Sequence, residues 1–221
     1  MIQLTRVSKI YETRQGNVVA LDSVDLSLER GAFAIVRGPS GSGKSTLLLT
    51  LGGMLRPVSG QVSVLGSDLY ALSHAGRTQF RAEHIGFIFQ MFHLIPYLNV
   101  LENILLSNSD PRQINTSHAI EWLERVGLKQ RMHHKPAQLS AGERQRVAVA
   151  RAMLTQPDLI LADEPTGNLD PDNAAEILRY LSEFQSNGGT VVLVTHGPMG
   201  DEYATRRFHL AQGKISEMVC A

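Results

Sequence analysis

Three short runs of consecutive apolar residues indicate strands that are buried on both faces. They occupy residues 33–36, 159–162 and 191–194. A strand covered on one face alternates apolar and polar residues, whereas a parallel strand covered on both faces is apolar throughout. Stretches of helical character separate these runs, so the pattern predicts an α/β core with a parallel sheet.

The rest of the chain follows two other patterns. Ile2, Leu4 and Val7 alternate with polar residues, and residues 18–21 follow a turn that we expect at residues 16–17, which indicates short strands. A mainly helical stretch at about residues 92–156 precedes the second apolar run. We expect this stretch to form a helical lobe that is inserted into the α/β core.

Composition and charge narrow the class of protein. The 221 residues suit one compact domain, and 21 basic residues balance 21 acidic ones, which argues against a nucleic-acid partner. The longest stretch without Asp, Glu, Lys or Arg, residues 84–101, is interrupted by polar residues, so we expect a soluble chain without a membrane span. The N-terminus has no signal-peptide pattern, and the single cysteine, Cys220, excludes an internal disulfide.

A glycine-rich loop follows the first apolar run and matches the pattern G-x-x-x-x-G-K-[ST]. Its glycines let backbone N–H groups converge on an anion, and the N-terminus of the helix that follows adds partial positive charge. We expect Lys44 to reach the β- and γ-phosphates of a nucleotide and the Ser45 hydroxyl to bind Mg²⁺. No Asn-Lys-x-Asp motif occurs, which argues against a GTPase. The residues expected to hold the phosphates are Gly38, Pro39, Ser40, Gly41, Ser42, Gly43, Lys44, Ser45 and Thr46.

Two acids follow the second apolar run directly. Asp163 is placed to hold Mg²⁺, and Glu164 is placed to orient or deprotonate the water that attacks the γ-phosphate. An ordinary acidic turn after a strand is the alternative interpretation. The glycine-rich loop earlier in the chain favours the interpretation of the two acids as metal-binding and catalytic residues.

His196 follows the third apolar run, at the strand end that faces the ligand crevice in open α/β sheets. We expect it to hydrogen-bond the γ-phosphate and to hold the attacking water in line with Glu164. Gln90 has two interpretations, either a buried core amide with satisfied hydrogen bonds or a ligand of Mg²⁺ and water that senses the γ-phosphate. We expect structural or surface roles for the other histidines, His74, His84, His93, His118, His133, His134 and His209.

A helix is predicted to begin after Ser140 and to run towards Leu154. Ser140 and Glu143 have the spacing of a capping box, in which each side chain bonds the backbone N–H of the other residue. Taken alone, this motif indicates good helix initiation and nothing more.

The order of these motifs resembles the ATPase subunit of ABC transporters. The order is the glycine-rich loop, Gln90, L-S-x-G-E at residues 139–143, L-A-D-E-P-T-G-N-L-D at residues 161–170, and Thr195–His196. Residues 86–96 and 161–170 resemble the lipoprotein-releasing and macrolide-efflux branch of that superfamily, to which the cell-division ATPase is a near relative. The resemblance extends over residues 11–215.

The resemblance implies a single nucleotide-binding domain over residues 1–221, with a P-loop NTPase core, an antiparallel β lobe and an inserted helical lobe. It implies that two subunits close head to tail around two Mg²⁺–ATP. Ser140 and Gly142 would then contact the γ-phosphate bound by the partner, and Asp170 would belong to a loop that links the two sites. Tyr11 matches the aromatic residue that stacks on adenine, with a surface-strand tyrosine as the alternative.

The resemblance also implies a separate integral membrane permease, which would hold the ATPase at the cytoplasmic face of the inner membrane. We expect export or extraction of a lipoprotein, a peptide or a drug-like molecule. A mechanical ATPase that acts on a membrane regulator of cell-wall enzymes is the alternative. Either a local core or a groove for a permease helix would explain a cluster of apolar side chains, Phe87, Phe89, Phe92, Leu94, Ile95 and Tyr97.

Three positions depart from the family pattern. Ala141 replaces the usual first glycine of the signature and would add strain if that position required a positive φ. Glu143 stands where the superfamily has glutamine, and residues 197–198 replace the usual aspartate after His196. None of these changes removes a catalytic group, so we expect an active ATPase. The presence of Glu164 argues against a regulator that binds nucleotide without hydrolysis.

Overall fold

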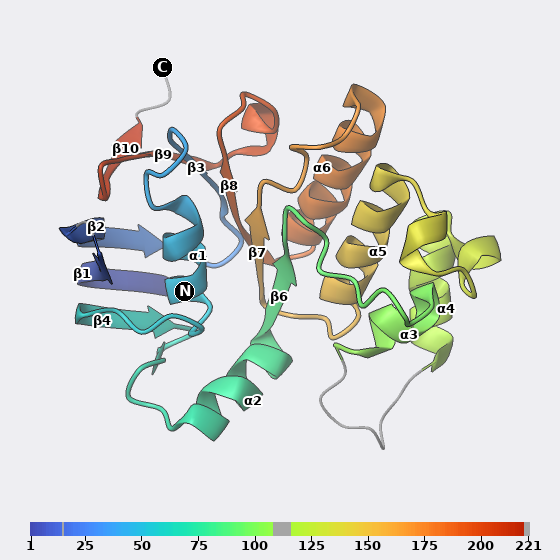
Figure 1. The fold of residues 1–221 in the computed structure, drawn as a ribbon, viewed down its shortest axis with the longest axis horizontal. Coiled ribbons are helices and arrows are strands. Elements are labelled where there is room, and N and C mark those ends of the chain that lie inside the picture. Colours follow the sequence, from blue (N-terminus) through green and yellow to red (C-terminus); the bar gives the residue numbers. More distant parts are fainter. Residues whose placement is uncertain (15, 108–115, 219–221) are drawn as a thin grey trace.

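The computed structural model describes residues 1–14, 16–107 and 116–218 (Figure 1). Cys220 and residues 108–115 of the expected helical lobe lie outside the described residues. Within the described residues, no helix has the length and apolar character needed to cross a membrane.

A six-stranded sheet forms the centre of the structure, in the order β10-β9-β3-β8-β7-β6. Four of its five neighbouring pairs are parallel, and only β10 runs antiparallel to its neighbour, β9, at one edge. The strands are β3 (Phe33–Arg37), β6 (Ile85–Ile88), β7 (Leu159–Asp163), β8 (Thr190–Thr195), β9 (Arg206–Ala211) and β10 (Lys214–Met218).

The three apolar runs form the middle of this sheet, as predicted. Alternate residues of each strand enter two different cores, so that Ile35 and Leu193 pack on one face while Val36 and Val194 pack on the other. Because both faces are covered, no position of these strands can be polar without losing contacts. This two-sided burial explains why the strands carry no apolar–polar alternation.

An antiparallel sheet covers one face together with α1 (Lys44–Leu51), in the order β2-β1-β4-β5 (Figure 1). Its strands are β1 (Ile2–Thr13), β2 (Gly16–Leu28), β4 (Ser59–Val64) and β5 (Ser67–Asp68). The prediction of a turn at residues 16–17 is wrong. Gly16 pairs with Thr13, and Asn17 pairs with Glu12, so both residues belong to strand β2. The strands are also longer than the short alternating segments indicated.

Helices cover the opposite face of the central sheet. Residues of α3 (Val100–Leu105), α4 (Thr116–Arg125), α5 (Ala141–Met153) and α6 (Pro171–Ser186) share one core with that face, whereas α2 (His74–His84) precedes β6 at the lower edge in Figure 1. Short 3₁₀ turns occupy Lys129–Arg131, Pro136–Gln138 and Asp201–Tyr203. The predicted α/β class with an antiparallel β lobe and a helical lobe is confirmed. The limits of that lobe, about 92–156 within one domain of 1–221, stay predictions.

Candidate functional site

A pocket of about 410 Å³ lies where the parallel strands β7 and β8 end. Tyr11, Lys44, Gln90, Glu164 and His196 line it, although they come from five distant parts of the chain. The carboxyl ends of parallel strands meet at one edge of a sheet, so residues that follow different strands converge there. The other predicted residues in its lining are Ser40, Gly41, Gly43, Ser45, Thr46 and Asp163.

The glycine-rich loop between β3 and α1 has the backbone of an anion site. Gly43 is the N-cap of α1 with φ 107°, and no side chain caps the helix, so its first N–H groups are available to an anion. A Cβ at Gly43 would collide with the carbonyl oxygen of Ala20, and one at Gly38 would collide with that of Leu210. The close approach of these carbonyls therefore requires glycine at both positions.

Lys44 is buried and its ammonium group is held by the loop itself. Nζ donates to the carbonyl oxygens of Gly38 at 2.8 Å and Pro39 at 3.0 Å. Glu164 Oε1 lies 3.9 Å from the same Nζ. The positive charge is thus kept at the mouth of the loop, where a phosphate oxygen can replace a carbonyl as its partner.

Asp163 ends β7 beside the first turn of α1. Burial raises the pKa of its carboxyl, while a hydrogen bond with Ser45 lowers it; the charge of Glu164 adds to the rise and that of Lys44 opposes it. Hard oxygen atoms are the ligands that Mg²⁺ prefers, and it is often held by one or two carboxylates together with substrate phosphates. The donor set of Asp163 and Ser45 fits that ion.

Glu164 is buried at the base of the pocket and is held from several sides. Its Oε2 lies 2.9 Å from His196 Nδ1 and accepts a bond of 3.3 Å from the backbone N–H of His196. Its own N–H donates to the carbonyl oxygen of Val194, and its φ of 45° is left-handed. Such a conformation is costly for a residue with a side chain and is typical of functional sites.

Gln90 and Tyr11 lie at the margins of the pocket. The side chain of Gln90 is exposed, so the interpretation as a buried core amide is wrong. Tyr11 is a partly exposed strand residue whose Oη lies 3.3 Å from Thr46 Oγ1, and its neighbour Val18 also lines the pocket. An apolar base could therefore lie against this hairpin.

Ser140, Gly142 and Asp170 do not line this pocket. Ser140 and Glu143 form the predicted capping box of α5, with bonds of 2.8 and 3.2 Å, and the Ser140 backbone N–H lowers the pKa of Glu143. Asp170 is the N-cap of α6 and accepts a bond of 3.0 Å from the N–H of Asn173. The family resemblance placed Asp170 only in a loop that links the two sites and did not predict this capping role. Gly142 packs directly on the Asn173 side chain, which leaves no room for a Cβ.

Ala141 is the first residue of α5 and its backbone is helical. It is absent from the non-glycine residues that have a positive φ in the described chain. The condition under which alanine would add strain here, a positive φ, is therefore not met in this structure.

A groove of about 380 Å³ lies between α2, β6 and α5 and shares no lining residue with the nucleotide pocket. Phe87 and Phe89, two of the apolar residues singled out above, line it together with Met54 and Leu106. Leu94 packs against the helical core and Tyr97 is exposed outside the groove. The apolar cluster thus divides between a local core and a groove.

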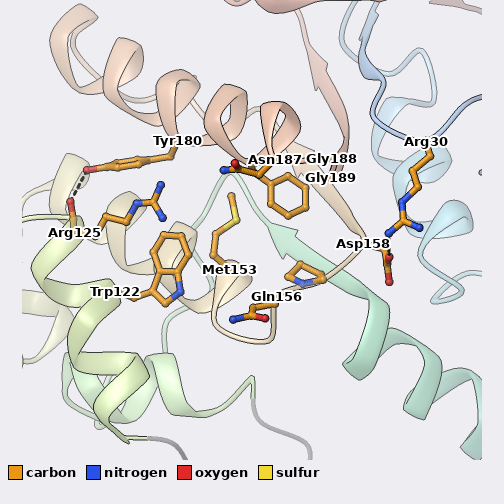
Figure 2. Close-up of a pocket in the computed structure, with 12 residues that line it drawn as sticks. Arg30, Trp122, Arg125, Met153, Gln156, Asp158, Tyr180, Asn187, Gly188 and Gly189 are labelled. Atoms are coloured by element: carbon orange, nitrogen blue, oxygen red, sulfur yellow. Dashed lines mark hydrogen bonds and ion pairs between the residues drawn. The ribbon is translucent and has the colours of Figure 1, made fainter.

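A further cavity, of about 360 Å³, lies at the opposite end of β7 (Figure 2). Figure 2 shows Trp122, Met153 and Gln156 around the hollow, with Arg30 paired to Asp158 at its rim. No residue predicted to bind nucleotide lines this cavity.

Sequence reasoning missed a contact between α5 and the segment after Gln90. Arg151 donates to the carbonyl oxygens of Phe92 and His93, both of which have a positive φ. Its only signal in the sequence is a single charge within the otherwise apolar residues 147–154.

Comparison with known proteins identifies the family. The ABC transporter family profile matches residues 21–167. The lipoprotein-releasing system ATP-binding protein LolD 1 of Rhodopirellula baltica is 44% identical over 219 residues, covering 97% of this chain and 96% of that protein. The macrolide export ATP-binding/permease protein MacB of Chlorobaculum tepidum is 41% identical, and the match covers 97% of this chain and 33% of that longer protein.

A solved structure has the same fold over its whole length. It is a dimeric, post-hydrolysis state of the ATP-binding cassette MJ0796 bound to ADP and Pi, with a TM-score of 0.91, 35% identity and 100% of both chains covered. The glycine-rich loop, the two acids after β7 and the family match all indicate the same family. The chain therefore belongs to the ABC transporter ATP-binding family and is an ATPase of that family.

Proposed function

We propose that two copies of this chain close head to tail around two Mg²⁺–ATP and drive a separate membrane permease. The observation that carries this proposal is the division of the predicted ATP ligands over two surfaces. Lys44, Asp163 and Glu164 share one pocket, whereas Ser140 and Gly142 lie outside it at the start of α5. One chain thus holds two incomplete halves, which a second copy in the opposite orientation would complete.

Within each pocket, the phosphates would lie on the N–H groups of residues 41–46 and the adenine against Tyr11. Lys44 would exchange its carbonyl partners for phosphate oxygens. Bound Mg²⁺, held by Ser45 and Asp163 with Gln90 at the rim, would neutralise charge that develops on the β- and γ-phosphates. The N-terminus of the partner's α5 would add the partial positive charge of a helix end near the γ-phosphate.

Glu164 would orient the attacking water and accept its proton, because its carboxylate already faces the pocket and is fixed by His196. His196 would be shared between Glu164 and the γ-phosphate. A carboxylate fixed in this way would hold the water in one orientation, which would favour in-line attack.

The experiment is Mg²⁺–ATP hydrolysis by the purified chain as a function of protein concentration, with Glu164→Gln beside it. A site shared between two copies gives a specific activity that rises with concentration. The variant should bind ATP and dimerise with it but should not turn over. Specific activity independent of concentration, in a chain that stays monomeric with ATP, would contradict the shared site.

We further propose that the groove between α2, β6 and α5 accepts a cytoplasmic helix of the permease, which would place the ATPase at the cytoplasmic face of the inner membrane. The apolar side chains of Phe87 and Phe89 in the groove support this assignment, and Phe89 directly precedes Gln90 in the chain. Export or extraction of a lipoprotein, a peptide or a drug-like molecule is the corresponding task. The names of the LolD and MacB relatives support it.

Co-purification with the permease from solubilised membranes tests the groove. Met54→Glu places a carboxylate in the groove and should reduce co-purification, whereas Val58→Glu adds the same charge at an exposed position outside it. Equal recovery of permease with both variants would rule out the groove as the docking site.

A further inference from the structure

Two consecutive residues, Phe92 and His93, adopt left-handed backbone conformations, with φ values of 60° and 47°. Neither is glycine or asparagine, the residues that occupy this region at low cost. Two such residues in succession persist only when the surrounding structure holds them. The segment must therefore be fixed by contacts outside itself.

The helix α5 supplies these contacts. Arg151 donates from Nη1 to the carbonyl oxygen of His93 and from Nη2 to that of Phe92, both at 2.7 Å. The guanidinium group of Arg144, two turns earlier on α5, lies over the Phe92 ring at 5.3 Å. The guanidinium fork of an arginine offers two separate nitrogens in one rigid plane, whereas a lysine at this position would offer a single nitrogen on a flexible chain.

This clamped turn adjoins both sites described above. Gln90, two residues before Phe92, lines the nucleotide pocket. The rings of Phe89 and His93 stack with centroids 4.5 Å apart, and both line the groove together with Arg151. The path of residues 89–93, from the groove to the pocket, is thus set by the turn that Arg151 holds.

We propose that Arg151 is a positioning residue for Gln90. By binding two successive carbonyls, Arg151 keeps the turn at residues 92–93 left-handed. Because the position of this turn is fixed, Gln90 is kept at the nucleotide pocket. The same contact joins the turn that follows Gln90 to α5, whose N-cap is Ser140 and whose first turn contains Gly142. This inference rests on the proposed role of Gln90 in hydrolysis.

Amide hydrogen exchange tests the clamp without relying on activity. The N–H groups of Phe92 and His93 donate within the turn, to the carbonyl oxygens of Phe89 and Met91. Arg151→Met removes the fork and keeps much of the side-chain length, and Arg151→Lys keeps the charge. Both variants should exchange these two amides faster than wild type, while amides in β7 and β8 stay protected. Unchanged exchange at residues 92–93 would overturn the clamp.

Steady-state hydrolysis tests the consequence for Gln90. Arg151→Met should lower kcat, by as much as about 10²-fold, with little change in KM for ATP, because displacement of a positioned group acts on the reaction more than on binding. Arg179→Met, which removes an exposed arginine of α6, is the matched control and should match wild type. An unchanged kcat in Arg151→Met would overturn the positioning role.

A rescue separates positioning from stability. Phe92→Gly in the Arg151→Met background lets the turn adopt its left-handed conformation without the clamp, so it should restore much of the lost kcat. A purely structural role for Arg151 predicts a lower Tm with no rescue of kcat, and that result would overturn the proposal. Gln90→Ala serves as the reference: if it hydrolyses ATP like wild type, the role of Gln90 fails, while exchange at residues 92–93 still decides the clamp.

Discussion

Glu164 and His196 are bound to each other at the ends of neighbouring parallel strands. Glu164 Oε2 lies 2.9 Å from His196 Nδ1, and the backbone N–H of His196 reaches the same oxygen at 3.3 Å, although 32 residues separate the two in sequence. Asp163 pairs with Val194 in the β7–β8 ladder, so Glu164, one residue after Asp163, and His196, two residues after Val194, lie at the same edge of the sheet. The backbone therefore sets the position of the carboxylate and the imidazole sets its orientation.

His196→Ala removes the imidazole and leaves Glu164 with only the backbone bond. We expect kcat to fall by about 10²-fold, the usual contribution of a positioned acid–base group, with little loss of ATP affinity. Steady-state hydrolysis and binding of a fluorescent ATP analogue measure the two effects. His209→Ala, at an exposed position of β9, is the control. A kcat equal to that of wild type would contradict a role for His196.

Tyr11→Ala should raise the Kd for ATP by about tenfold, since stacking of one base on an aromatic ring contributes about 1–3 kcal/mol. Tyr11→Phe keeps the ring and loses only a long contact with Thr46, so its Kd should stay close to wild type. Isothermal titration with ATP measures both. If the phenylalanine variant binds as weakly as the alanine variant, the hydroxyl and not the ring carries the interaction.

Ala141→Gly should not raise turnover, because Ala141 already has a helical backbone. Glycine in a helix is less favourable than alanine, so we expect the free energy of unfolding to fall by up to about 1 kcal/mol. Urea denaturation and ATP hydrolysis of the variant measure these effects. A gain in kcat would show that the closed dimer needs a conformation at this position that alanine resists.

Glu143→Gln should change the acid dependence of stability. The Ser140 N–H lowers the pKa of Glu143 in the folded state, so the ionised group stabilises the fold above its unfolded pKa of about 4.3. This contribution is lost as the pH falls through the lower, folded-state pKa. Glutamine can complete the same capping box without titrating. Urea denaturation across this range should show a pH-dependent component in wild type that the variant lacks.

The parts of the fold that sequence predicted are those with one dominant physical signal. Residues 159–162 have no polar member, and burial on both faces of a sheet is what such a run favours. Ser140 and Glu143 form a capping box at the start of α5, so the sequence predicted where this helix begins. The start of α6 carried a comparable signal, Asp170 followed by Pro171 as N-cap and first helical residue, which was overlooked.

The residues of the candidate site that follow parallel strands could also be predicted from the sequence. They follow separate parallel strands, and the topology alone brings such strand ends together. The left-handed turn at Phe92 and His93 was not predictable, because neither residue type signals that conformation. The hairpin turn was misplaced for the converse reason, since Gly16 is a turn-forming residue that lies within the β1–β2 pairing.

Lys44 joins two carbonyl groups of its own loop. Its ammonium group spans the carbonyls of Gly38 and Pro39, and these two bonds support the curvature of the loop from within the chain. Nucleotide binding is then an exchange of partners around one ammonium group and needs no folding of the loop. A loop held in this way loses little conformational entropy on binding, which favours affinity for the nucleotide.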